Sequence, residues 1–219
     1  MNTQSVFRLS GSAVVVGALV SVAAHLIDGL TYRDPIAYTS YAMAAGGILV
    51  LAGLPGVMAS RAQGFGVAGL LGVALVFAAN CMTEVFGSLQ SAMVDPWLAA
   101  QAPKLAAGFG PPPFFAFFNI AEGLLVLGSL LIAIPIVRGL VAPRWPGFVL
   151  LASVVIGIPG YFLFALATDP FGNLMGQVPV VLLSIALAGI GYQAWLKPEP
   201  QVAATTARPQ AASGLCATE

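Results

Sequence analysis

The chain has 219 residues, of which 59% are hydrophobic and 7% are charged, and its formal net charge is zero. Because soluble domains carry about 25% charged residues, this composition excludes an ordinary soluble domain and indicates an all-α polytopic membrane protein. A neutral chain also offers no basic surface for a nucleic acid.

Six hydrophobic runs each approach the roughly 20 residues that a helix needs to cross a bilayer. The predicted spans are residues 10–30, 38–60, 65–90, 114–137, 147–168 and 174–196. Together they form a six-helix membrane domain, residues 10–196, which a short segment, residues 1–9, precedes. The tail, residues 197–219, is rich in Pro, Ala, Thr and Gln, so we expect it to be disordered.

The first span ends in a polar stripe. Ser21, His25 and Asp28 are spaced i, i+4 and i+7, which places them on one face of a helix. An ionisable side chain inside a span costs about 3 kcal/mol or more, so it usually faces a cavity or a partner. Pro35 then ends any helix before the second span, in which Pro55 predicts a kink.

The third span carries two stripes. The first contains small residues that favour close helix contact, namely Gly64, Ala68 and Gly72. The second contains an acid, and its members are Phe77, Asn80, Cys81 and Glu84. Although residues 64–69 match a dinucleotide-binding pattern, they follow no strand, so we interpret them as helix packing. Residues 91–113 form the longest internal connection, and residues 97–100 within it are suited to a short interfacial helix.

The fourth span repeats the combination of Phe, Asn and Glu. Its stripe is formed by Phe115, Phe118, Asn119 and Glu122 at i, i+3, i+4 and i+7. Glu122 lies inside an apolar run, which favours a functional role for this acid. The alternative is a protonated glutamic acid that is hydrogen-bonded to a neighbouring helix and only supports packing.

The last two spans add further polar and aromatic residues. Residues 157–160, Gly-Ile-Pro-Gly, predict a break or bend in the middle of the fifth span. Tyr161 and Phe164 follow on one face, and Asp169 lies at the end of this span. Gln177 lies near the start of the sixth span.

Basic residues are distributed unevenly between the two sides of the predicted bundle. Six are on the side of the termini, namely Arg8, Arg61, Arg138, Arg144, Lys197 and Arg208, and two, Arg33 and Lys104, are on the other side. The positive-inside rule therefore places both termini in the cytoplasm and the chain in the cytoplasmic (inner) membrane of the cell. In this orientation the embedded polar residues gather in the outer half of the bundle, and the inner half is almost purely aliphatic.

This convergence gives the candidate site. The candidate catalytic residues are Asp28, Glu84, Glu122 and Asp169. The candidate substrate-binding residues are His25, Phe77, Asn80, Phe115, Phe118, Asn119, Tyr161, Phe164 and Gln177. We expect Glu84 and Glu122 to face each other across one cavity, each level with the asparagine of the other helix. Two carboxyl groups in a low-dielectric pocket repel each other's charge, so one stays protonated and can act as a general acid.

Metals and cofactors have few possible ligands in this chain. His25 is the only histidine, and the two cysteines, Cys81 and Cys216, are far apart in the sequence. These residues are too few for a zinc or bis-histidine haem site within one chain. No Asp-Asp-x-x-Asp run is present to hold magnesium and a diphosphate. We therefore expect no metal and no cofactor.

An acid beside aromatic faces, open to lipid, suits protonation of an alkene or epoxide and stabilisation of the resulting cation. In size, hydropathy and intramembrane acids, residues 10–196 resemble integral-membrane terpene cyclases, which cyclise prenylated aromatic or indole metabolites. The composition also resembles that of bacterial membrane proteins from high-GC genomes. The resemblance to the cyclases implies a metal-independent cyclase that starts its reaction by protonating a lipophilic small molecule.

Two other functions fit the same sequence. Intramembrane acids and histidine also form proton relays, and interrupted spans also form substrate sites, as in a transporter or proton-coupled permease. Against transport, the two halves share no repeated motif beyond the Phe/Asn/Glu pattern, and the inner half offers no polar exit path. The third function is a non-catalytic membrane subunit, which the Gly/Ala stripe would serve.

Overall fold

The computed structural model describes residues 2–31, 37–102, 112–141, 143–166 and 170–197, and every long element in this part of the chain is a helix. The side chains of residues 37, 112, 115, 160–166 and 170–173 lie outside the description. The α-helices are α1 (Thr3–Leu30), α2 (Ala37–Ala59), α3 (Ala62–Asn80), α4 (Asp95–Gln101), α6 (Pro112–Val137), α7 (Trp145–Leu166) and α8 (Pro170–Leu196). Two π-helical segments, η1 (Cys81–Gly87) and η2 (Gln90–Val94), connect α3 to α4.

The prediction of an all-α, multi-pass membrane protein is confirmed at this level. Five stretches are long and apolar enough to cross a membrane, namely Thr3–Leu30, Tyr38–Ala59, Ala62–Gln101, Ala116–Val137 and Leu174–Leu196. The sixth expected span corresponds to α7, whose described side chains form a shorter apolar segment, Trp145–Pro159.

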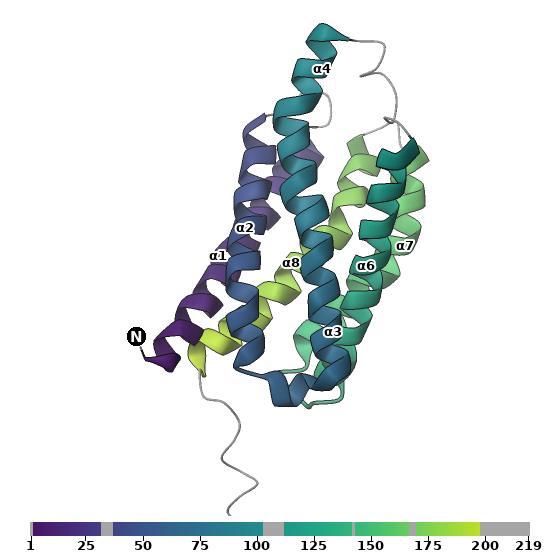
Figure 1. Ribbon diagram of the computed structural model, residues 1–219. Helices are drawn as coiled ribbons and strands as arrows, with labels where there is room; N and C mark the ends of the chain where they lie inside the picture. Colours follow the sequence, from purple (N-terminus) through teal and green to yellow (C-terminus); the bar gives the residue numbers. More distant parts are fainter. Residues whose placement is uncertain (1, 32–36, 103–111, 142, 167–169, 198–219) are drawn as a thin grey trace, which may run out of the picture.

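The long helices pack in chain order around a ring (Figure 1). Helix α1 packs against α2 and α8, α3 packs against α6, and α7 packs against both α6 and α8. The contact between α2 and η1 closes the ring. The first and last helices meet where Gly11 lies against the backbone of Gly191, so α1 begins and α8 ends at the same end of the bundle. We call this the basic end, because the connections that carry Arg61, Arg138 and Arg144 are also there.

Two predicted boundaries were wrong. Helix α1 begins at Thr3 rather than near residue 10, and the Asn2 side chain caps it by accepting a hydrogen bond of 3.4 Å from the backbone N–H of Gln4. The third span does not end near residue 90, because helix continues without a loop to Gln101. Pro96 permits this continuation, since it falls in the first turn of α4, where a missing N–H costs little.

The third predicted span is therefore a helix of 40 residues, which corresponds to a length of about 60 Å. It is not regular throughout. At Gly66 the backbone takes φ 61° and ψ −175°, a conformation that is open to glycine and strained for other residues, so the helix is kinked there. The Gly-rich pattern of residues 64–69 thus has a structural role in the bundle.

The predicted break in the fifth span is not found. Helix α7 continues from Trp145 to Leu166 with Pro159 inside it. Pro55 likewise lies inside α2. Prolines are tolerated within membrane helices because neighbouring groups and local adjustments satisfy the carbonyls that they leave free.

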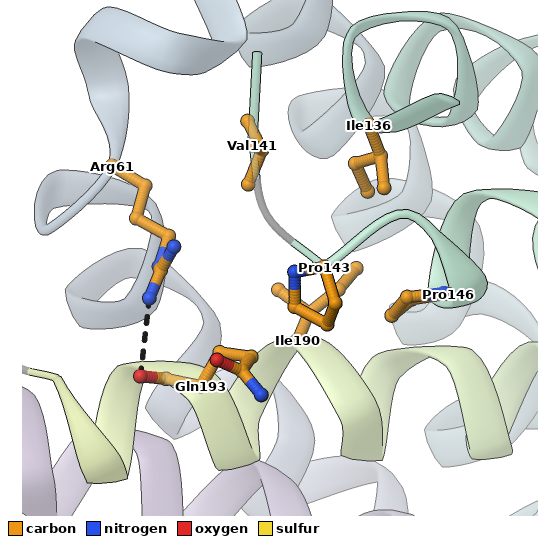
Figure 2. Close-up of a pocket in the computed structure, with 7 residues that line it drawn as sticks. All are labelled: Arg61, Ile136, Val141, Pro143, Pro146, Ile190 and Gln193. Atoms are coloured by element: carbon orange, nitrogen blue, oxygen red, sulfur yellow. Dashed lines mark hydrogen bonds between the residues drawn. The ribbon is translucent and has the colours of Figure 1, made fainter. Parts of the chain in front are cut away.

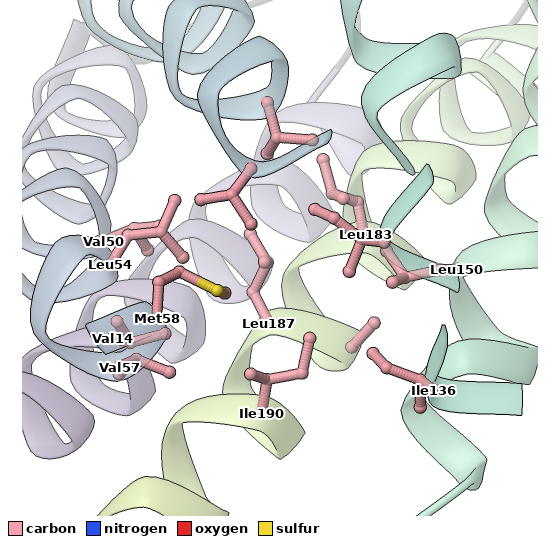
Figure 3. Close-up of a cluster of buried hydrophobic side chains, with 14 of the residues drawn as sticks. Val14, Val50, Leu54, Val57, Met58, Ile136, Leu150, Leu183, Leu187 and Ile190 are labelled. Carbon is pink, nitrogen blue, oxygen red and sulfur yellow. The ribbon is translucent and has the colours of Figure 1, made fainter. Parts of the chain in front are cut away.

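The hydrophobic core lies in the half of the bundle nearest the basic end, and we call this half the apolar half (Figure 3). Its largest fully buried side chains include Leu54, Ile132, Ile136, Leu150 and Leu187. Glycines bring the backbones together here: a Cβ atom at Gly72 would lie 2.8 Å from the carbonyl oxygen of Gly128. Gly64 and Gly72 of the predicted small-residue stripe make such contacts, whereas Ala68 is exposed. Close packing of this kind is what holds helices together in lipid.

Candidate functional site

The opposite half of the bundle, which we call the polar half, contains Glu84 in the middle of η1. The side chain of this residue is buried, with 7% of its surface exposed. At the preceding residue, the Thr83 hydroxyl donates a hydrogen bond of 3.0 Å to the Ala79 carbonyl, an interaction that often bends a helix. A π-helical turn holds one residue more than an α-helical turn and is frequent at functional sites. The local backbone therefore gives Glu84 an orientation that α-helical periodicity does not predict.

A pair of glycines in α2 lets the neighbouring helices approach each other. A Cβ atom at Gly46 would lie 2.7 Å from the Ser21 hydroxyl oxygen of α1, and one at Gly47 would lie 2.9 Å from the Glu84 Cβ. Real Cβ atoms do not come so close to other atoms, so neither position tolerates a side chain without movement. Helix α2 is thin at this level, which allows Glu84 to reach past it to α1.

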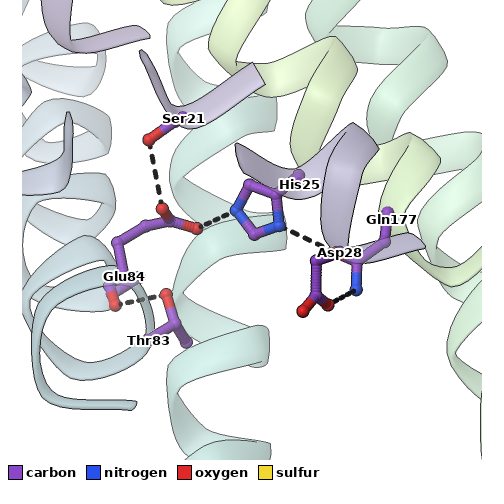
Figure 4. Close-up of polar contacts among 7 residues, drawn as sticks. Ser21, His25, Asp28, Thr83, Glu84 and Gln177 are labelled. Atoms are coloured by element: carbon purple, nitrogen blue, oxygen red, sulfur yellow. Dashed lines mark hydrogen bonds and ion pairs between the residues drawn. The ribbon is translucent and has the colours of Figure 1, made fainter. Parts of the chain in front are cut away.

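Glu84 is hydrogen-bonded through both carboxyl oxygens to the polar stripe of α1 (Figure 4). Its Oε1 lies 2.9 Å from His25 Nε2, and its Oε2 accepts a hydrogen bond of 3.3 Å from the Ser21 hydroxyl. His25 is as buried as Glu84, with 7% of its surface exposed. A buried histidine–carboxyl pair that shares one proton is a reactive arrangement inside a membrane.

The other ring nitrogen of His25 leads to a second acid. His25 Nδ1 lies 2.8 Å from Gln177 Oε1 of α8, and Gln177 Nε2 donates a hydrogen bond of 3.3 Å to Asp28 Oδ2. The Thr39 hydroxyl of α2 donates a hydrogen bond of 3.4 Å to Asp28 Oδ1. Because the Gln177 amide directs its N–H group to Asp28, its oxygen faces His25, and Nδ1 must be the protonated nitrogen. Nε2 is then the nitrogen that exchanges a proton with Glu84.

Glu122 approaches this network from α6. It lies on the same side of the helix as the buried Ser129 and Ala133, seven and eleven residues further on, whereas Ile120 and Leu127 are exposed. Phe118, one turn before Glu122, packs against Gly87, three residues after Glu84, so α6 and η1 are in contact beside the two acids. The two acids therefore share one region of the polar half. The described hydrogen bonds of Glu84 go to His25 and Ser21, and its expected pairing with Asn119 stays a prediction.

Aromatic side chains gather beside the acids at the start of α6. Phe117 contacts Phe86 of η1 and Phe118 edge to face, with ring centroids 5.4 and 5.3 Å apart, and Phe114 contacts Phe118 at 4.9 Å. Phe118 also packs over Gly87, where a Cβ atom would lie 3.1 Å from its ring. The side chain of the predicted residue Phe118 thus extends from α6 toward η1. It belongs to a cluster whose ring faces suit an electron-poor ligand.

The structure brings together five of the predicted site residues: His25, Asp28, Glu84, Glu122 and Gln177. Asn80 is buried one turn before Glu84, but among the described residues no hydrogen bond joins it to the network. Phe77 has 37% of its surface exposed, and its role in substrate binding stays a prediction. Asp169 and the side chains of Phe115, Tyr161 and Phe164 lie outside the described residues.

Two members of the network, Ser21 and Thr39, were not predicted to be site residues. Ser21 was visible in the stripe of α1 but was not assigned a role. Thr39 gave no signal at all, because a single threonine at the start of an apolar helix is ordinary. The aromatic partner Phe86 was missed as well, since it lies two residues after Glu84 and α-helical spacing separates it from the predicted stripe.

A small pocket is found at the basic end, far along the helices from the polar half (Figure 2). Arg61 lines it and donates a hydrogen bond of 3.1 Å from Nη2 to the Gln193 carbonyl. Its volume of about 10 Å³ accommodates at most a single water molecule, so it does not hold a substrate. Within the described ranges, no group of three His, Cys, Asp or Glu residues is arranged to hold a metal ion.

Comparisons with protein-family models, with curated proteins and with solved structures found no match for this chain. The site is therefore interpreted from its own geometry.

Proposed function

We propose that this chain is a membrane-embedded enzyme that transfers a proton to a lipophilic substrate in the polar half of the bundle. The observation that carries the proposal is the buried Glu84–His25 contact of 2.9 Å. An isolated acid in a membrane is costly in free energy. Here Ser21, Gln177 and Asp28 form hydrogen bonds that hold Glu84 and its proton partner His25 in place. Such a pair can hold, release and recover a proton without a cofactor.

The proposed reaction is an isomerisation. A proton adds to one carbon of an alkene in a prenylated molecule, and the alkene π electrons form the new C–H bond. A second double bond of the same molecule attacks the resulting cation and closes a ring. Loss of a proton to the site then forms a new double bond. The Phe114, Phe117 and Phe118 rings support this reaction, because aromatic faces stabilise a neighbouring cation. Integral-membrane terpene cyclases, which this chain resembles in layout, act in this manner.

A proton-coupled transporter is the second candidate, because the same His25 relay could bind and release a transported proton. The apolar half favours the enzyme. Leu54, Ile132 and Leu187 fill the bundle between the polar network and the basic end. At most 2% of the surface of each is exposed. A site that opens on one side suits a substrate that enters from lipid and leaves into lipid.

The test uses membranes that contain the protein, a farnesylated indole as the probe, and D₂O as the solvent. We expect an isomer of unchanged composition with one carbon-bound deuterium, and its rate should fall about 10²-fold or more in E84Q. D95N is the matched control, because Asp95 is an exposed acid on the same long helix. Proton-driven accumulation of the probe in vesicles, without isomer formation, would establish the transporter instead.

The proposal includes a topology of six spans with both termini in the cytoplasm of the cytoplasmic membrane. It is motivated by the basic residues of the described chain, all of which lie toward the basic end. Single cysteines at Gln63 and Arg144, in a background without Cys81 and Cys216, should resist a membrane-impermeant reagent in intact cells and react in inverted vesicles. Labelling of either position from outside would refute this orientation.

A further inference from the structure

Glu84 and Glu122 lie in the same half of the bundle but in different surroundings. From this difference we infer a division of labour that rests on the proposed function: Glu122 gives the proton to the substrate, and the Glu84–His25 pair takes the final proton back. Two acids with different surroundings are the usual basis for separate acid and base roles in one site.

Glu84 is built to be a carboxylate. Its two oxygens accept from the Ser21 hydroxyl and face His25 Nε2. Donors directed at a carboxyl group favour its ionised form, and a charge-assisted bond to an imidazolium is among the stronger hydrogen bonds. Gln177 completes the arrangement, because it accepts from His25 Nδ1 and leaves Nε2 to serve Glu84. With His25 protonated, the pair is neutral as a whole, which lowers the cost of keeping it in the membrane.

Glu122 is built to stay neutral. It has no hydrogen-bond partner among the described residues, although it is partly buried and lies on the helix side of the buried Ser129 and Ala133. A carboxylate without a donor or a counter-ion is costly in a low-dielectric interior, so such a group retains its proton. Glu84 lies across the contact between η1 and α6, where Phe118 packs against Gly87, and ionising both acids would bring two like charges together. Glu122 therefore carries a transferable proton in the resting protein.

The proton count closes over one turnover. The O–H bond of Glu122 breaks, its proton goes to an alkene carbon, and the carboxylate left behind balances the charge of the cation. After ring closure, a C–H bond next to the cationic carbon breaks, its electrons form a double bond, and Glu84 accepts the proton. A proton then returns from the Glu84–His25 pair to Glu122. No oxidant, reductant or co-reactant is needed.

Infrared spectroscopy of membranes without any substrate tests the resting state. The chain is labelled with ¹³C at its glutamate carboxyls, so that aspartates do not contribute. We expect a protonated-carboxyl C=O band, sensitive to D₂O, in the wild type and in E84Q, and loss of this band in E122Q. E122Q keeps the shape of the side chain, and a thermal melt checks that the variant is folded. D95N is the control for the loss of an acid outside the site. The band's loss in E84Q with retention in E122Q, or its absence from the wild type, would overturn the assignment.

The products formed from the farnesylated indole test the roles. E122Q should form no deuterated product, because protonation of the alkene is blocked. E84Q should lose the isomer about 10²-fold and form instead an alcohol in which water has captured the cation. A deuterated isomer from E122Q at the wild-type rate would refute Glu122 as the donor. A wild-type protein that is inactive on prenylated probes, but has the predicted infrared band, would count against the proposed enzyme and leave the protonation states standing.

Discussion

The two halves of this bundle are held together by different forces. In the apolar half, close-packed aliphatic side chains and glycine contacts such as Gly72 with Gly128 join the helices without any polar group in the core cluster. In the polar half, hydrogen bonds from His25, Gln177 and Thr39 connect α1, α2, α8 and η1 through side chains that would each be costly in lipid alone. Since packing in lipid needs no such groups, the polar half carries a cost that stability does not require. The packing that holds the fold and the polar groups of the proposed site therefore lie in different halves of the bundle.

Among the changes that compare the two halves, the largest expected effect is the loss of the isomer in E84Q. The change keeps the size of the side chain and its contacts with Ser21, but it removes the group that exchanges a proton with His25. We expect product formation to fall about 10²-fold or more, with little change in the melting temperature of the purified protein in detergent. A large drop in melting temperature would mean that the polar half stabilises the fold after all.

Leu187→Ala should have the opposite profile. Leu187 is fully buried in the apolar half, with 2% of its surface exposed, and truncation of such a side chain typically costs about 2–5 kcal/mol. Denaturation of the protein in mixed micelles measures this loss. The product formed per folded molecule should equal that of the wild type, and a change in turnover of tenfold or more would contradict the separation of the two halves.

Gly47→Ala lies at the border between the halves and should affect both properties. Its Cβ atom would lie 2.9 Å from the Glu84 Cβ, so Glu84 must move relative to His25. We expect a loss of about 1–3 kcal/mol from overpacking and a roughly tenfold loss of turnover, since 1.4 kcal/mol in the barrier gives that factor.

Gly123→Ala is the matched control for Gly47→Ala, because a Cβ atom there would meet no atom within 4 Å. It should leave turnover unchanged and stabilise the helix by about 0.5–1 kcal/mol. Equal losses of turnover in the two variants would show that the approach of α2 to Glu84 does not matter.

Thr39→Val should have a smaller effect. The change keeps the shape and removes the 3.4 Å hydrogen bond to Asp28, which is worth about 0.5–1.5 kcal/mol. Asp28 then holds Gln177 less firmly, and turnover should fall a few-fold. A double-mutant cycle of Thr39→Val with Gln177→Leu should show a nonzero coupling energy, and strict additivity would place Thr39 outside the relay.

Removal of the tail should have no effect. Residues 198–219 lie outside the described part of the chain, so their predicted disorder stays a prediction from composition. A protein that ends at Pro198 should insert into membranes and form product at the wild-type rate. If turnover is lost while insertion is normal, the tail belongs to the site.

Hydropathy was sufficient to predict an all-helical, multi-pass architecture and its separation into two halves, because both depend on composition along each helix. The stripe Ser21, His25 and Asp28 was also predictable, since α1 is regular over these residues. The partial exposure of Phe77 could not be predicted, because η1 interrupts the α-helical period between it and Glu84. The partners of Glu84 could not be predicted, because they depend on how closely α2 allows η1 and α1 to approach. Nothing in a single sequence reports that distance.

The π-helical segment η1 has a consequence for insertions and deletions. An α-helical turn in this place would need one residue fewer, so the orientation of Glu84 depends on the number of residues between the glycine contacts of α3 and the acid. Deletion of Met82, which removes no member of the network, would therefore let η1 close into α-helical turns with little rotation of the residues beyond it. Insertion of one alanine after Val76, in the regular part of α3, would instead turn everything beyond it by about 100° around the helix axis. A chain with this one extra residue would keep the same acid and would direct it away from His25.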